Sequence, residues 1–174
     1  MRSTGEVLGL ADNFPLAFYK AEEAANAILP SAPVAGEKKT VLISLSQKDN
    51  QKKEALDMAR AFSYLGFNIL ATEGTNKFFN ENGIKSEAIA KIGEGRPNVL
   101  DVILNNEVCL VVNTPGIRND NRAHEGTIRK SALRYKVPYI TTLAGAKAAV
   151  DGIGTVRNGK GDVKSLQDYH AQIN

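Results

Sequence analysis

The chain contains a single cysteine, no tryptophan and no apolar run approaching the length of a membrane span. Its longest apolar stretches are short, such as VCLVVN at 108–113, whereas a spanning helix needs about 20 apolar residues. No long apolar region lies near the N-terminus, which argues against a secretory signal. A lone cysteine cannot form an internal disulfide, so we expect a cytoplasmic protein without membrane association.

An excess of charge of one sign is also missing. The 22 basic and 19 acidic residues leave a net charge of +3, and the densest basic patch is KDNQKK at 48–53. Without interleaved basic and aromatic residues, nucleic-acid binding is not expected, and a small anionic ligand accounts for the excess charge more simply. Cys109 lies in an apolar stretch with no charged neighbour to lower its pKa, which predicts a structural thiol instead of a nucleophile.

The N-terminal thirty residues differ from the rest. They predict a short strand, a turn and a helix over Pro15–Ile28, because proline suits a first helical position and the apolar spacing is helical. Residues 30–39, PSAPVAGEKK, have the composition of a linker. We therefore expect an appendage at 1–29, a linker at 30–39 and the main domain at 40–174.

From Thr40 onward, strand and helix patterns alternate. Strands are expected at 40–46, 67–72, 86–92, 108–114 and 137–142, and helices at 50–65, 76–81, 98–106, 122–136, 144–151 and 166–172. This alternation predicts an α/β fold, a doubly wound five-stranded parallel sheet with flanking helices. Ligands of such folds bind beyond the carboxyl ends of the strands.

The residues that follow the predicted strands are hydroxyls, amides, lysines and glycines. They include Ser44, Ser46, Lys48, Lys52, Thr72, Gly74, Thr75, Lys77, Lys91, Arg96, Asn113, Thr114, Thr141 and Thr142. Hydroxyl donors, a lysine and the N–H groups at a helix start can surround a phosphate. The alternative for each single threonine is that it caps the following helix.

No clustered Asp or Glu, His pair or cysteine belongs to this set, so no carboxylate is expected in a position to react with a bound phosphoryl group. His124 and His170 are far apart on predicted helices, and Asp101 is expected to face solvent. No metal-ligand spacing is present. The pattern favours a site that binds an anion without carrying out a reaction.

Several motifs resemble a known family. LATEGT, EGRPNVLD, VVNTPG, IRKSALRYKVPYITTLAGAKA and YHAQIN resemble the C-terminal regulatory domain of the carbamoyl phosphate synthetase large subunit, in the methylglyoxal synthase-like superfamily. The opening MRSTGEVLGLADNFPLAFYKAEEAAN resembles the end of the preceding ATP-grasp synthetase domain. The resemblance implies that 1–29 is a remnant of that domain and that the chain is a non-catalytic, cytoplasmic fragment of a larger ligase.

The resemblance also implies an allosteric site for UMP or IMP. The matching positions are Ser44, Lys52, Thr72, Thr75, Lys91, Asn113 and Thr114. Ser46 competes with Ser44, because SLSQKDNQK contains an apparent two-residue insertion, and Pro115 replaces a family threonine. Tyr139 and Thr141 match residues beside the family's ornithine site.

Further expectations follow from the family. The parent enzyme, of pyrimidine and arginine biosynthesis, uses ATP with Mg or Mn, and its partners are the synthetase domains and the glutaminase small subunit; no cofactor is expected in this chain. The enzymatic alternative is a methylglyoxal synthase-type phospho-sugar lyase, but Arg96 and Pro97 stand near the position of its aspartate base. A module that only mediates homo-oligomerisation is the third possibility.

Overall fold

The computed structural model describes residues 6–46, 48–50, 52–116, 122–159 and 163–173. Its elements, in chain order, are α1 Phe14–Ala24, β1 Thr40–Ser44, α2 Lys53–Tyr64, β2 Asn68–Thr72, α3 Glu73–Glu81, β3 Glu87–Ile89, α4 Val99–Leu104, β4 Leu110–Asn113, α5 Arg122–Arg134, β5 Tyr139–Ile140, α6 Leu143–Arg157 and α7 Leu166–His170. The five strands form one parallel sheet in the order β3-β2-β1-β4-β5. The predicted fold is confirmed.

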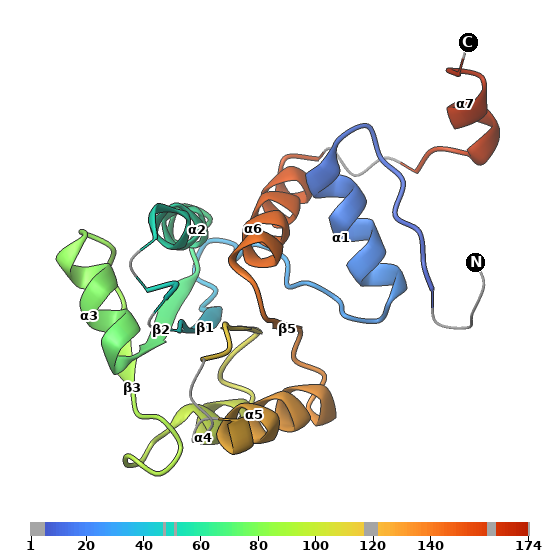
Figure 1. Cartoon of the computed structure of the whole chain (residues 1–174). Coiled ribbons are helices and arrows are strands. Elements are labelled where there is room, and N and C mark those ends of the chain that lie inside the picture. The colour runs from blue at the N-terminus through green and yellow to red at the C-terminus, as the bar shows by residue number, and fades with distance from the viewer. Residues whose placement is uncertain (1–5, 47, 51, 117–121, 160–162, 174) are drawn as a thin grey trace.

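The sheet is covered on both faces, with α1, α2 and α6 on one side and α4 and α5 on the other (Figure 1). Successive residues of β1 show how one strand serves both layers: Val41 and Ile43 pack in the first core, and Leu42 in the second. All three are at most 1% exposed. Burial on both faces explains why the central strands are continuous apolar runs instead of alternating patterns.

The chain order places a switch point between β1 and β4. The first half of the chain builds outward through β2 and β3, and the second half builds the other way through β4 and β5. The crossovers therefore diverge at this point and leave a crevice at the carboxyl ends of the strands. Any rim site should lie there, above β1, β2 and β4.

The N-terminal helix α1 packs on α6, as Figure 1 shows. Asn13 caps α1 by accepting a 3.0 Å hydrogen bond from the Leu16 backbone N–H, and Leu16 is buried. The approach is close because Gly152 has no side chain: a Cβ there would lie 2.8 Å from the Pro15 carbonyl oxygen. The division into an appendage at 1–29 and a linker at 30–39 stays a prediction.

Several predicted boundaries are wrong. Residues 6–13 form no strand, and α1 ends at Ala24 instead of Ile28, which is 62% exposed. The α3 helix starts three residues earlier than predicted, directly after β2, and α6 runs on to Arg157. β5 is shorter than predicted, and only two of its residues pair with β4. Neighbouring elements decided these limits, because local sequence preference is weak near element ends.

Candidate functional site

The carboxyl ends of β1, β2 and β4 bring a cluster of hydroxyls together. Ser44 pairs in register with Asn113 on one side, and Ile43 pairs with Ala71 on the other, which sets Thr72 beside Ser44. The Thr72 hydroxyl lies 3.4 Å from Ser44 Oγ and 3.4 Å from Thr75 Oγ1. Three of the predicted residues therefore share one site.

Thr75 fixes the loop that follows β1. Its Oγ1 accepts a 3.1 Å hydrogen bond from the Leu45 backbone N–H, and the side chain is 1% exposed. A hydroxyl has one donor hydrogen and two lone pairs, so Thr75 can accept from both Leu45 and Thr72 and still donate. Thr72 precedes α3 but makes no side-chain capping bond. Capping, the alternative for these threonines, therefore does not account for Thr72.

A second group of donors surrounds one carboxylate. Lys52 Nζ donates to Asp49 Oδ1 at 2.8 Å, and Ser46 Oγ donates to Asp49 Oδ2 at 3.0 Å. The Thr114 hydroxyl accepts a 2.7 Å hydrogen bond from the Ser46 backbone N–H and helps to lower the pKa of this carboxyl. Of the two candidate serines, Ser46 joins this donor group, whereas Ser44 lies beside Thr72.

The rim includes one carboxylate that was not predicted, that of Asp49. Asp49 reaches it because the chain turns back after β1: the Asp49 backbone N–H donates to the Ser46 carbonyl at 3.0 Å and lies 3.3 Å from its hydroxyl. The stretch KDNQKK resembles a solvated charged loop, which hides this turn. The Ser-x-x-Asp spacing at 46–49 was the available signal.

The charge state of Asp49 follows from its partners. The Lys52 ammonium, followed by the Ser46 and Thr114 hydroxyls, holds the pKa of this carboxyl below its ordinary value. The same ion pair raises the pKa of Lys52, whose side chain is 42% exposed. Asp49 is therefore an anion at neutral pH, with too low a pKa to serve as an efficient general base.

The other predicted rim residues divide between two places. Asn113 is buried, and its Nδ2 donates a 2.7 Å hydrogen bond to the hydroxyl of Tyr139, one of the two ornithine-side candidates. Thr141, the other candidate, is exposed after β5. Lys91 is exposed after β3, and among the described residues its side chain makes no hydrogen bond to the hydroxyl cluster. The geometry thus unites Asn113 with Tyr139 and leaves Lys91 at the edge.

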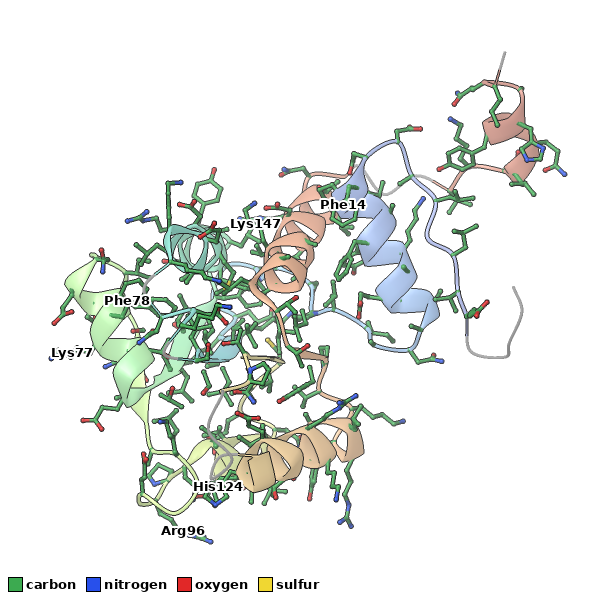
Figure 2. The ribbon with its side chains drawn as sticks, viewed as in Figure 1. Phe14, Lys77, Phe78, Arg96, His124 and Lys147 are labelled. Carbon is green, nitrogen blue, oxygen red and sulfur yellow. The ribbon has the colours of Figure 1, made fainter. Side chains whose placement is uncertain are left out.

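Two other side chains, those of Lys77 and Asn50, lie near the start of α3. Lys77 points away from the sheet on α3 (Figure 2), where it is 76% exposed and 4.0 Å from Glu81. Asn50 instead donates a 3.0 Å hydrogen bond to the Gly74 carbonyl. Its Oδ1 is buried without a partner in the described part of the chain. Asn50 was not predicted, and its unused acceptor lies beside the start of α3.

A cavity of about 860 Å³ opens next to the Asp49 group. Its walls are the loop after β1, α2, the start of α6 and Phe14 of α1, which Figure 2 shows at the end of that helix. The predicted rim residues that line it are Ser46, Lys48, Lys52, Thr141 and Thr142, and Asp49 lines it as well. Thr72 and Thr75 do not, so the cavity is bordered by the Asp49 group and not by the hydroxyl cluster around Thr72.

The GEGRPN turn has no aspartate, its one carboxylate is that of the exposed Glu94, and the aspartate that follows it, Asp101, is engaged. Asp101 accepts a 2.9 Å hydrogen bond from the Asn98 backbone N–H, completing a capping box, and lies 3.4 Å from Arg96. Its side chain is 19% exposed, so the expectation that it faces solvent is wrong. His124 lies beside this turn, close to Gly93, and Figure 2 places it near Arg96.

Other classes of site find no support in the described ranges. Within them, no three His, Cys, Asp or Glu side chains gather as metal ligands would. No helix in the described part of the chain is both long enough and apolar enough to cross a bilayer. The rim is therefore the site best equipped with polar groups.

Comparison with known proteins identifies the same family. The chain is 48% identical over 172 residues to the carbamoyl phosphate synthase large chain of Archaeoglobus fulgidus, covering 99% of this chain and 15% of that protein. It is 41% identical over 170 residues to the carbamoyl phosphate synthase large chain, C-terminal section, of Methanopyrus kandleri, covering 98% of this chain and 30% of that protein. The chain thus spans less than a third of either relative.

The chain also resembles a solved structure over part of its length. The crystal structure of methylglyoxal synthase from Elizabethkingia anophelis NUHP1 aligns with a TM-score of 0.49 and 14% identity, covering 65% of this chain and 77% of that one. The MGS-like domain family matches residues 54–141, which include β2, α3, β3 and β4. The chain belongs to the MGS-like domain family.

Proposed function

We propose that this chain is the regulatory domain of a carbamoyl phosphate synthase large chain and that it binds a nucleoside monophosphate, such as UMP or IMP, through its phosphate group. Two lines of support combine. The relatives named above are large chains of that enzyme or their C-terminal sections. The rim of the sheet offers hydroxyl, ammonium and backbone donors at a switch point, which is where such folds bind ligands.

The convergence of donors on one anion is the observation that carries the proposal. Lys52 and Ser46 donate to the Asp49 carboxylate, and the Thr114 hydroxyl lies close enough to help lower its pKa. Groups that hold a carboxylate can hold a phosphate oxygen, because both are oxyanions that favour charge-assisted hydrogen bonds. The start of α3 adds backbone N–H groups near Thr72 and Thr75, with the favourable end of the helix dipole.

The lyase alternative is less favoured by the same geometry. Proton abstraction needs a base whose pKa lies near the working pH. Asp49 has a lowered pKa, and Asp101 is engaged in its capping box and with Arg96. We expect no methylglyoxal from dihydroxyacetone phosphate, and measurable turnover would establish an enzyme instead of a regulatory domain.

Calorimetric titration with UMP and IMP tests the proposal. Lys52→Ala should weaken binding about tenfold or more, because a hydrogen bond to a charged group contributes ~1.5–3 kcal/mol. Lys53→Ala is the matched control: it removes the adjacent lysine, which is 83% exposed and pairs with Asp57 at 2.6 Å. Absence of heat with either nucleotide at millimolar concentration, or equal loss in both variants, would count against the site.

Regulation itself requires the rest of the enzyme. An effector acts only through a difference in affinity between two states, commonly ~1–3 kcal/mol. We propose that the partners are the synthetase domains of the same large chain and its glutaminase small subunit. The alternative, a module that only oligomerises, predicts a change of mass with concentration and no response to UMP, which light scattering distinguishes.

A further inference from the structure

Asp49 occupies the position that the proposed function assigns to a phosphate oxygen. Its two carboxylate oxygens are 2.8 Å from Lys52 Nζ and 3.0 Å from Ser46 Oγ. The Thr114 hydroxyl lies close enough to help lower the pKa of the same carboxyl. The Lys52 ammonium and the Ser46 hydroxyl are thus both engaged by one residue of the same chain.

We propose that Asp49 is an internal occupant of the phosphate site, which a phosphate ligand must displace from Lys52 and Ser46 before it can bind. This inference rests on the proposed function and adds a residue that sets the affinity of the site. Asp49 lies on the connection between β1 and α2, and two side chains, each within 3.0 Å, hold its carboxylate there. Its displacement would free a lysine and a hydroxyl at once.

The other carboxylates near the loop do not compete for these donors. Asp57 is held by Lys53 at 2.6 Å and by Arg60 at 3.7 Å. Glu125, beyond β4, accepts a 2.9 Å hydrogen bond from the Gly116 backbone N–H. Glu54, on the first turn of α2, acts on Lys52 only through its charge. Asp49 alone among these four bonds directly to the donor group.

The internal carboxylate lowers the apparent affinity in two ways. Only the fraction of molecules in which Asp49 has left the donors can bind, and the apparent dissociation constant rises in inverse proportion to that fraction. A phosphate dianion that binds beside an unmoved Asp49 would also face a like charge across a few ångströms. Neutralising Asp49 removes both effects.

Calorimetry on the 174-residue chain, with inorganic phosphate and UMP as separate probes, tests the proposal. Asp49→Asn should bind both about tenfold more tightly than the wild type, which corresponds to ~1.4 kcal/mol. Asp168→Asn is the control: its carboxylate also accepts from a serine three residues earlier, Ser165 Oγ at 2.6 Å, but it lies on α7 and does not line the cavity. Its affinity for both probes should match the wild type.

The outcomes separate this inference from the function beneath it. If the wild type binds the probes and Asp49→Asn binds them no more tightly, Asp49 is not an internal occupant, and the proposed nucleotide site is still supported. Weaker binding of UMP with unchanged phosphate affinity also overturns the internal occupant, because Asp49 would then contact the ribose. If neither protein binds either probe, the proposed function fails and the inference with it.

A measurement on the wild type removes any dependence on how the variant folds. In a ¹³C NMR titration with inorganic phosphate, the side-chain carboxyl resonance of Asp49 should shift as the carboxylate leaves Lys52. The Asp168 resonance should stay in place. Equal shifts of both, or of neither while phosphate binds, would overturn the displacement.

Discussion

Replacing Thr75 with valine removes one hydroxyl from the rim while keeping a β-branched side chain of the same size. The Thr75 side chain is 1% exposed, and its Oγ1 accepts the Leu45 N–H at 3.1 Å. Valine would leave that buried N–H without its acceptor, which costs ~1–3 kcal/mol. For a chain of this length, a loss of about 2 kcal/mol lowers Tm by about 4–8 °C.

The assay combines thermal unfolding with calorimetric titration of UMP. Thr155→Val is the matched control, since the Thr155 hydroxyl only donates to the Asp151 carbonyl within α6, at 2.9 Å. Such bonds add little to helix stability, so the control should melt within about 1 °C of the wild type. Thr75→Val should also bind UMP more weakly, because the hydroxyl proton that could reach a phosphate is gone.

Two results would refute this reasoning. A Tm for Thr75→Val equal to that of Thr155→Val would mean that the Leu45 N–H finds another acceptor. Unchanged UMP affinity in a properly folded Thr75→Val protein would mean that Thr75 supports the loop but does not contact the ligand. The proposed site would then be confined to the Lys52 group.

Three further predictions concern the α1 contact, the thiol and the acid response. Gly152→Ala should destabilise the chain by ~1–3 kcal/mol, because its Cβ would lie 2.8 Å from the Pro15 carbonyl oxygen. The control, Gly154→Ala, meets only ordinary contacts and should gain up to ~1 kcal/mol of helix propensity. Equal melting temperatures of the two variants would contradict this. Burial raises the pKa of the Cys109 thiol to about 11, so only about one molecule in a thousand is thiolate at pH 8. Ellman's reagent should therefore react at least 100-fold faster with the protein unfolded in urea than with the native protein. Fast labelling of the native protein would instead show that the thiol is accessible. Folding lowers the pKa of Asp49, so its contribution to stability is complete above about pH 4 and is lost as the pH falls through the folded pKa. The difference in unfolding free energy between the wild type and Asp49→Asn should therefore close at low pH. A difference that stays constant with pH would disprove this.

The sequence predicted the sheet because its signals are local. Apolar runs with β-branched residues, such as TVLIS at 40–44, can be buried on both faces only in a covered parallel sheet. Element ends were predicted less well. The start of α3 at Glu73 depends on how Thr72 and Thr75 pack under the loop after β1, which lies some thirty residues away in sequence.

The site was half predicted for the same reason. Ser44, Thr72 and Thr75 come together because parallel strands align their carboxyl ends. The strand pattern in the sequence is enough to predict that alignment. Asp49 was missed because its role depends on a turn that folds it back onto Lys52. In sequence it is one charge among many.

The sequence alone determined the class of fold, the kind of residue that gathers at the strand ends and the family to which the chain belongs. Only the tertiary structure decided which of those residues meet: Asn113 bonds to Tyr139, Thr114 accepts from the Ser46 backbone N–H, and Lys91 lies apart. The physical reason is that strand and helix patterns are set by neighbours a few residues away. Hydrogen bonds at the rim instead join side chains that only the packed sheet brings within 3 Å of each other.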